Sequence, residues 1–267
     1  MTMMDRVARN TTVKPAMMLV YGVAGIGKTS LGASTPNPIF LQTEDGLGTL
    51  DVNTFGLLKT FDEIMAAIVA LYEEPHDFQT VVLDSVDHLE TIVWAQTCKD
   101  NGWKSIDETS YGKGYIAALD NWRLILDGLR ALRDDRGMTV LLVAHSTIIK
   151  FSAPDSESYD RYSPKMHKAA SALVMETMDA VLFCNYRVST VSTDVGFNKK
   201  ITRGVGGGDR MIYTEERPAF VAKQRYDMPA SIPMTWIAIA EHIPAPKALQ
   251  PRQPAPSATS ATSANAD

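Results

Sequence analysis

Short unbroken apolar runs along the chain alternate with longer segments whose apolar residues recur every three or four positions. The apolar runs lie at residues 17–21, 39–43, 79–85, 138–144 and 180–185. Runs of this length are typical of strands in a parallel sheet that is covered on both faces. The pattern therefore predicts an α/β fold, with a mostly parallel sheet flanked by helices.

Helical periodicity fills the segments between most of these runs. We expect helices over residues 30–35, 86–99, 116–135 and 170–178. A further helix is predicted to begin at Thr60, which forms a capping-box signature with Glu63. The amphipathic face of each helix would cover the sheet.

The C-terminal third has a different pattern. Residues 186–213 alternate Val, Ser and Thr and then contain three consecutive glycines, which predicts a hairpin or a loop. Two short apolar segments, residues 219–222 and 234–239, predict antiparallel strands that close the sheet. From residue 244 onward Pro, Ala, Ser and Thr dominate, so this segment cannot bury a core and is expected to be disordered.

These patterns divide the chain into three parts. We expect a flexible N-terminus over residues 1–14, one α/β domain over residues 15–243 and a disordered tail over residues 244–267. A chain of 267 residues can bury a core that needs no stabilising disulfide or metal. Cys98 and Cys184 belong to no CxxC pattern and no histidine cluster, so we expect two free thiols.

Charge and hydropathy exclude several classes of protein. The net charge of −5 argues against a protein that coats nucleic acid through bulk positive charge, so any nucleic-acid site must be a local basic patch. The chain has no run of 18 apolar residues, and residues 1–15 lack the apolar segment of a secretion signal. The sequence therefore predicts a cytoplasmic protein without a membrane partner.

The first apolar run leads directly into a glycine-rich segment. Residues 22–29, GVAGIGKT, fit the pattern G-x-x-x-x-G-K-[ST]. Glycines let backbone N–H groups wrap a phosphate, while Lys28 would reach the β- and γ-phosphates and Thr29 a Mg²⁺ ion. The expected nucleotide-binding residues are Gly22, Val23, Ala24, Gly25, Ile26, Gly27, Lys28, Thr29 and Ser30.

Polar residues end the later apolar runs, at the sheet edge where ligands bind in open α/β folds. Asp84 ends the third run, in the position of a carboxylate beside the Mg²⁺ ion of a nucleotide. Glu44 and Asp45 follow the second run, and His145 follows the fourth. His145 either touches the γ-phosphate or simply terminates its strand.

Two segments combine basic residues with aromatic residues or glycines. Residues 146–168 interleave basic side chains with Phe151, Tyr159 and Tyr162, a combination that suits single-stranded nucleic acid. Acidic residues dilute this segment, so a mobile solvated loop is an equal alternative. Residues 186–213 add a second basic cluster. The candidate nucleic-acid contacts are Lys150, Arg161, Lys165, Lys199, Lys200 and Arg203.

In this order, GVAGIGKT, FLQTEDG, TVVLDSV and TVLLVAH resemble the RecA-type ATPase core of recombinases, replicative helicases and circadian-clock ATPases. The resemblance covers residues 17–240 and implies a RecA-like P-loop fold and Mg²⁺-dependent ATP hydrolysis. The compact format is most similar to the short RecA-like ATPases of bacteriophages, which are associated with single-strand annealing and recombination. It implies action on single-stranded DNA in a host cytoplasm, as a ring or filament, with a single-strand-binding protein as a further partner.

The same resemblance implies catalytic roles. Glu44 falls where the family keeps the carboxylate that polarises the attacking water, and His145 falls where it keeps a γ-phosphate sensor, usually Gln. Lys223 and Arg225 resemble a K-x-R element that some members insert into the nucleotide site of the neighbouring subunit. With Lys28, these residues form the expected catalytic set. For Lys223 and Arg225, a charged sheet edge that guards against aggregation is the alternative.

Three functions remain open from the sequence. The leading hypothesis is an ATPase that acts on single-stranded DNA in recombination, annealing or replication. The second is a helicase or helicase-loading motor, and the third is an ATP-gated switch that binds a protein partner. The rate of ATP hydrolysis with and without single-stranded DNA separates the first two hypotheses from the third.

Overall fold

The computed structural model describes residues 3–9, 11–152, 157–194 and 200–246. Within residues 188–194 and 200–207 it describes the backbone alone. Most of the predicted disordered tail lies outside the described residues, so its conformation stays a prediction.

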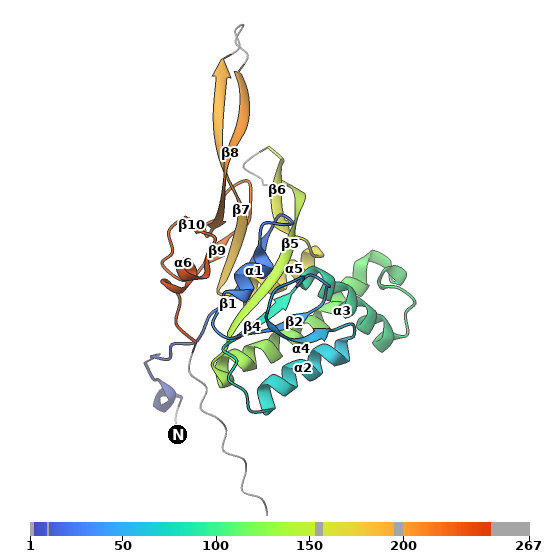
Figure 1. The fold of residues 1–267 in the computed structure, drawn as a ribbon. Helices are drawn as coiled ribbons and strands as arrows, with labels where there is room; N and C mark the ends of the chain where they lie inside the picture. Colours follow the sequence, from blue (N-terminus) through green and yellow to red (C-terminus); the bar gives the residue numbers. More distant parts are fainter. Residues whose placement is uncertain (1–2, 10, 153–156, 195–199, 247–267) are drawn as a thin grey trace, which may run out of the picture.

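A single twisted sheet runs through the molecule (Figure 1). Its main strands are β1 (Met17–Gly22), β2 (Pro38–Gln42), β3 (Asn53–Leu57), β4 (Thr80–Asp84), β5 (Thr139–Phe151), β7 (Ala180–Asp194), β8 (Lys200–Tyr213) and β10 (Ser231–Pro233). They are arranged in the order β10-β8-β7-β1-β5-β4-β2-β3. The six strands from β7 to β3 in that order are parallel, whereas β8 and β10 pair antiparallel. The predicted mostly parallel α/β sheet is confirmed.

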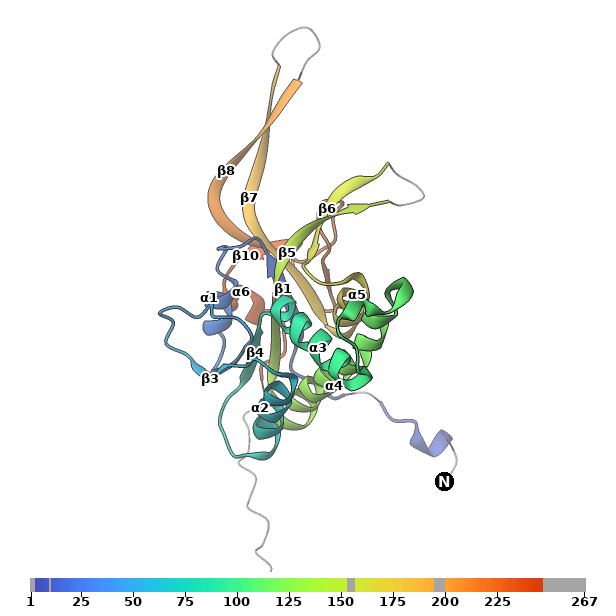
Figure 2. The same ribbon diagram turned by 90° about the vertical axis from the view of Figure 1, so that its right-hand side faces the viewer.

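Helices cover both faces of this sheet (Figure 2). One face carries α2 (Phe61–Glu73), α3 (Val86–Asn101), α4 (Lys113–Arg136) and α5 (Lys168–Thr177). The other face carries α1 (Lys28–Ala33) and α6 (Trp236–Ala240). Short 3-10 helices lie at Met4–Arg6, Ile106–Glu108 and Ser110–Gly112.

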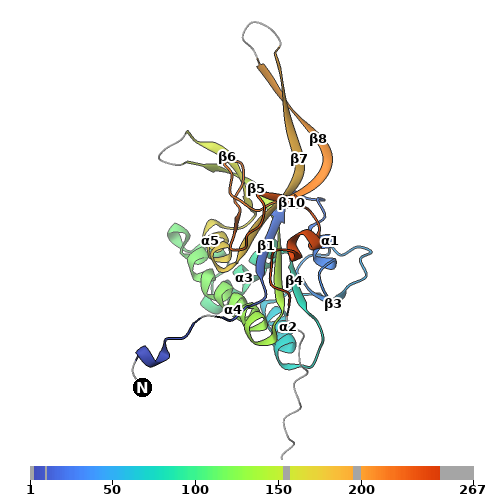
Figure 3. The same cartoon turned by 90° about the vertical axis from the view of Figure 1, so that its left-hand side faces the viewer.

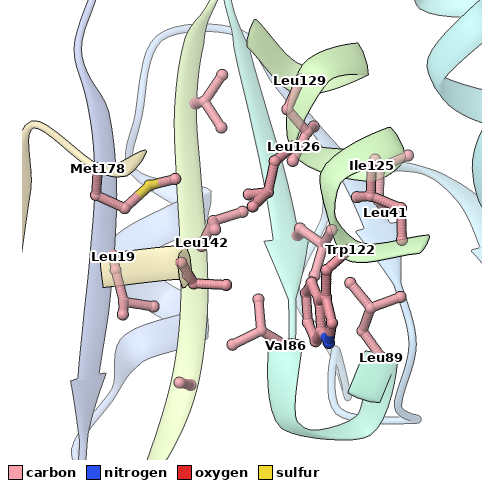
Figure 4. Packing of buried hydrophobic residues seen from close by; sticks show 14 of the residues in the cluster. Leu19, Leu41, Val86, Leu89, Trp122, Ile125, Leu126, Leu129, Leu142 and Met178 are labelled. Atoms are coloured by element: carbon pink, nitrogen blue, oxygen red, sulfur yellow. The ribbon is translucent and has the colours of Figure 1, made fainter. Parts of the chain in front are cut away.

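Side chains of the central strands alternate between two hydrophobic clusters. In β1, Leu19 belongs to the cluster beneath α2 to α5, whereas Val20 belongs to the cluster beneath α1 and α6. Trp122 and Leu126 of α4 lie in the larger cluster, near Leu142 of β5 (Figure 4). Because both faces are covered, the inner stretches of the central strands are apolar on both sides, as their sequences predicted.

Two hairpins project beyond the helices from the carboxyl edge of the sheet (Figures 1 and 3). In the first, β5 continues past its predicted end and pairs with β6 (Tyr159–Pro164) from Ser146 to Phe151. The prediction of an irregular loop over residues 146–168 is therefore wrong. In the second hairpin β7 pairs with β8, which confirms one of the two alternatives predicted for residues 186–213.

The strands that close the sheet differ from those predicted. Residues 234–239 were predicted to form a strand, but most of them lie in α6. The Thr235 side chain accepts a hydrogen bond from the Ala238 N–H and so caps this helix. Trp236 and Ile239, three positions apart, turn the same face into the core.

Residues 219–222 were also predicted to form a strand, but Phe220 makes only isolated bridges, to Tyr162 and Arg217. The antiparallel closing strands are instead β10, which pairs with β8, and β9 (Lys223–Gln224), which pairs with the start of β7. The edge strand β3 had no counterpart in the predictions.

Two local predictions are confirmed. The Thr60 and Glu63 side chains form both halves of the capping box at the start of α2. Cys98 and Cys184 are free thiols. In the described part of the chain, no helix is both long and apolar enough to cross a membrane. The segment before β1 extends away from the sheet (Figure 1).

Candidate functional site

The phosphate loop joins the end of β1 to the start of α1 at the carboxyl edge of the sheet. Gly27 immediately precedes α1 with a φ of 102°, a left-handed conformation that favours glycine. Gly22 is required for packing, because a Cβ atom there would lie 2.1 Å from the carbonyl oxygen of Cys184. The glycines therefore serve both the turn of the loop and the close approach of β1 to β7.

Lys28 points into the phosphate loop and is only 6% exposed. Its Nζ donates hydrogen bonds to the carbonyl oxygens of Gly22 at 3.1 Å and Val23 at 3.0 Å. Burial lowers the pKa of this ammonium group. A buried cation whose hydrogen-bond partners are neutral carbonyls is stabilised by an incoming anion, as a phosphate-binding lysine requires.

Thr29 and Asp84 meet beside Lys28, although they lie 55 positions apart in the chain. The Thr29 Oγ1 donates to Asp84 Oδ2 at 2.7 Å. Burial raises the pKa of Asp84, against the effect of this hydrogen bond. The other oxygen, Oδ1, is buried and has no hydrogen-bond partner among the described residues. The Thr29 hydroxyl and the Asp84 carboxylate, with one oxygen that has no hydrogen-bond partner among the described residues, form a hard oxygen donor set that fits Mg²⁺.

Glu44 follows β2 and faces the same cleft. Its Oε2 lies 2.6 Å from Nδ1 of His88, in the first turn of α3. A carboxylate oxygen can only accept a hydrogen bond, so this contact requires the proton on Nδ1. His88 was not among the residues proposed from the sequence. A polar residue in the first turn of a helix resembles an ordinary solvated position, and the partner lies 44 residues away.

Asp87 of α3 holds His145 where β5 leaves the core. Asp87 Oδ1 accepts from the backbone N–H of His145 and Oδ2 contacts its ring Nδ1, both at 3.0 Å. Burial raises the pKa of Asp87, but the hydrogen bonds from His145 and Ser85 outweigh burial and leave the pKa below its usual value. His145 therefore has a fixed orientation at the edge of the cleft.

These side chains line one cleft of about 500 Å³. From the predicted site it brings together Gly25, Gly27, Lys28, Thr29, Ser30, Glu44, Asp84 and His145. The loop after β2 adds the apolar side chains of Leu47 and Leu50. The remaining predicted residues, Gly22, Val23, Ala24 and Ile26, complete the phosphate loop. Asp45, the alternative acid, is exposed beside Glu44.

Arg210 is a second residue that the sequence analysis missed. It lies on β8, 184 positions from the phosphate loop, and its NH1 donates to the carbonyl oxygen of Ile26 at 3.4 Å. The same nitrogen lies 2.6 Å from where a Cβ atom on Gly27 would be. Arg210 thus brings a guanidinium to the outer side of the loop, and no local motif could have indicated this contact.

The candidate nucleic-acid residues have different environments. Lys150 and Lys165 are exposed at the β5–β6 hairpin and its base. Arg161 is 6% exposed, because its guanidinium bonds Glu216 and lies 4.8 Å from the ring centroid of Phe151. Its guanidinium is therefore already paired within the chain, and its contact with nucleic acid stays a prediction. Lys199 lies outside the described residues, and of Lys200 and Arg203 only the backbone is described.

Lys223 and Arg225 lie at the opposite edge of the sheet from the phosphate loop. Lys223 pairs with Val181 at the start of β7, which runs parallel to β1. The Lys223 Nζ donates to the carbonyl oxygen of Glu176 at 3.4 Å, and Arg225 NH1 lies 3.1 Å from Asp179 Oδ1. Within one chain, these two cations are therefore remote from the cleft.

Comparison with known proteins supports the assignment of a nucleotide site. A family model described as an AAA domain matches residues 14–226. This match spans the cleft and both hairpins. A search of curated proteins finds no match to the chain.

Proposed function

The chain belongs to the AAA-domain family of P-loop ATPases, and from that premise we propose that it is a Mg²⁺-dependent ATPase that acts on single-stranded DNA in recombination or annealing. The observation that carries the ATPase part is the single cleft that contains Lys28, Thr29, Asp84 and Glu44. These groups are the ones needed to bind phosphates, hold a metal ion and orient a water molecule.

Each group has its own role in the proposed reaction. Lys28 binds the β- and γ-phosphates, since its ammonium is already buried in the loop. Thr29 and Asp84 would hold Mg²⁺, which neutralises charge on the phosphate oxygens. Glu44 orients the attacking water and accepts its proton, because its carboxylate faces the cleft from the end of β2.

The position of the two hairpins supports DNA as the substrate. Both leave the sheet at the edge that carries the nucleotide cleft, one from each neighbour of β1. The β5–β6 hairpin exposes Lys150 together with the apolar side chains of Ile148 and Ile149. It also carries a tilted ring pair, Phe151 and Tyr159, with centroids 5.4 Å apart. Cations and rings on one projecting element suit the phosphates and bases of a single strand.

The test is the rate of ATP hydrolysis by the purified chain, with and without single-stranded DNA. We expect Mg²⁺-dependent turnover that increases when the DNA is added, and none in Lys28→Ala, which lacks the phosphate-binding cation. Turnover by Lys28→Ala at the wild-type rate would contradict the assignment of the phosphate loop. A wild-type rate that DNA leaves unchanged would favour the ATP-gated switch.

The same experiment, extended to duplex DNA with a single-stranded end, addresses the motor hypothesis. A helicase would separate the strands in an ATP-dependent manner, whereas an annealing or recombination protein would pair complementary strands. We expect pairing, because the cations and rings of the projecting β5–β6 hairpin suit a single strand.

We propose further that the active form is a ring or filament in which Lys223 and Arg225 enter the nucleotide site of the neighbouring subunit. The supporting observation is their remoteness from the cleft of their own chain. A cation near the γ-phosphate of an adjacent subunit stabilises the charge that develops there during hydrolysis.

Mixed subunits test this assembly. Arg225→Ala and Lys28→Ala should each be inactive alone, but a mixed interface joins an intact cleft to an intact Arg225. Activity should therefore return on mixing and rise steeply with protein concentration. A mixture that stays inactive while both variants assemble would contradict the role of Arg225 in trans.

A further inference from the structure

Polar contacts connect five side chains along the carboxyl edge of the sheet. The Glu44 Oε2 lies 2.6 Å from Nδ1 of His88, which in turn lies 3.6 Å from Asp87 Oδ2. Asp87 Oδ2 is 3.0 Å from Nδ1 of His145. The hydroxyl oxygen of Ser85 also lies 2.8 Å from the His88 Nδ1. Residues from the loop after β2, from α3 and its N-terminus, and from β5 thus meet in a single network at the nucleotide cleft.

We propose that His88 is a positioning residue for Glu44, an inference that rests on the proposed function. A glutamate side chain has several rotatable bonds, and Glu44 stands beyond the last residue of its strand, so its carboxylate is free to take many orientations. The 2.6 Å contact between its Oε2 and Nδ1 of His88 selects one of them. Orienting a water for attack requires that carboxylate to be held within a fraction of an ångström.

His88 can position Glu44 because His88 is itself fixed. It lies in the first turn of α3, directly after the strand that ends in Asp84. Its neighbour Asp87 has a side chain that is 3% exposed and is anchored on the backbone N–H of His145. The His88 side chain remains 46% exposed, so core packing does not account for its placement. Its contacts with Glu44 and Ser85 do.

The network ends at the root of the β5–β6 hairpin. His145 is the last residue of β5 that pairs with β1, opposite Gly22, and the hairpin ladder begins at the next residue, Ser146. The His145 carbonyl oxygen also accepts from the Lys165 N–H at 2.8 Å, just after β6. His88 therefore holds Glu44 relative to the hairpin as well as to α3.

Steady-state kinetics of three variants, together with binding of a fluorescent ATP analogue, test the inference. His88→Ala should lower kcat about tenfold or more, because the catalytic carboxylate is misplaced, and should change KM and analogue affinity less than about twofold. His88→Asn places an amide N–H close to the position of Nδ1 and should restore most of the rate. His242→Ala, just after α6 and outside the cleft, is the matched control and should behave as wild type.

A double variant gives the sharpest readout. If His88 acts through Glu44, adding His88→Ala to Glu44→Gln should cost no further activity. A second tenfold loss in the double variant, or an equal loss in His88→Asn and His88→Ala, would overturn the inference. So would wild-type kcat in His88→Ala. Where His88→Ala does not fold, His88→Asn and His88→Phe supply the same contrast. No turnover by the wild-type chain would overturn the proposed function and the inference together, whereas the other outcomes separate them.

Discussion

The two hairpins leave the same sheet edge on either side of β1, but different contacts hold their roots. The root is the part of each hairpin that adjoins the sheet, near His145 in the first and near Tyr186 and Arg210 in the second. The β5–β6 hairpin is rooted on the buried side chain of Asp87, since His145 is bonded to it through both its backbone and its ring. The β7–β8 hairpin has an irregular root. Its register shifts between Tyr186 and Val188, and Gly208 has a φ of 78°.

The roots also reach different parts of the nucleotide site. Through Asp87 and His88, the β5–β6 hairpin connects to Glu44, the proposed hydrolytic group. Through Arg210, the β7–β8 hairpin contacts the phosphate loop itself. We therefore expect variants at the first root to change the chemical step and variants at the second to change nucleotide binding. Variants at each root can separate the two effects.

The largest expected effect is at Glu44, where the network that begins at the base of the β5–β6 hairpin ends. Glu44→Gln should slow hydrolysis at least about a hundredfold, the usual scale for losing a general base, while ATP binding persists. Single-turnover hydrolysis and titration with a fluorescent ATP analogue measure the two quantities. Asp45→Asn, the exposed neighbour, is the matched control. If Glu44→Gln hydrolyses normally and Asp45→Asn does not, Asp45 is the base.

The second effect concerns Glu90 of α3, which bonds the backbone just after the β5–β6 hairpin. Both carboxylate oxygens of Glu90 accept from the His167 N–H, and burial raises the pKa of Glu90 to about 7. The folded state therefore binds this proton more tightly than the unfolded state, whose Glu pKa is about 4.5. The stabilisation of the folded state by the proton on Glu90 is complete below pH 4.5 and is lost as the pH rises through 7.

Glu90→Gln cannot lose a proton, so it should match wild type near pH 4.5 and be more stable at pH 8 by about 3 kcal/mol. Urea unfolding at both pH values measures the difference. Glu73→Gln, an exposed position on α2, should show no such pH dependence. An equal stability difference at the two pH values would contradict a buried proton on Glu90.

A smaller effect is expected at the other root. Arg210→Ala removes an exposed guanidinium from the phosphate loop and should weaken ATP binding about fivefold, with kcat unchanged. Analogue titration and steady-state kinetics separate the two. Arg187→Ala, a cation on the opposite strand of the same root, should leave affinity unaltered. A loss of kcat in Arg210→Ala would show that both roots act on hydrolysis.

The smallest effects distinguish the hairpins as DNA contacts. Each lost phosphate contact should reduce the salt dependence of single-strand affinity by about 0.7 in log–log slope. Lys150→Ala on the first hairpin should remove one such contact. Replacing Lys199, Lys200 and Arg203 together on the second should remove up to about 2 units of slope. An unchanged slope in both variants would place the DNA site elsewhere.

Local rules determined much of this protein from its sequence. The strands that lead to Gly22 and Asp84 could be predicted, because a strand buried on both faces requires an unbroken apolar run. The phosphate loop is one contiguous segment, so the spacing of its residues is enough to predict it. The capping box at Thr60 lies within four residues and is likewise readable. For Thr29 and Asp84, the expected meeting at one sheet edge followed from parallel strands.

The sequence failed where its pattern did not separate one element type from another. Residues 146–151 form a regular strand, yet they stand outside the sheet and need no alternation of apolar and polar positions. Residues 234–239 read as a strand because a short apolar run fits a buried strand and a buried helix equally well. The Thr235 cap and the face shared by Trp236 and Ile239 make it a helix.

Contacts between distant segments were decided by tertiary structure alone. The fold brings His88 to Glu44 and Arg210 to Ile26, and it turns Arg161 inward onto Glu216 and Phe151. The sequence determined which groups could bind and hydrolyse a nucleotide, because their motifs are local and set by backbone geometry. Which side chains hold those groups in place depends on how strands and helices pack, and a one-dimensional pattern does not contain those distances.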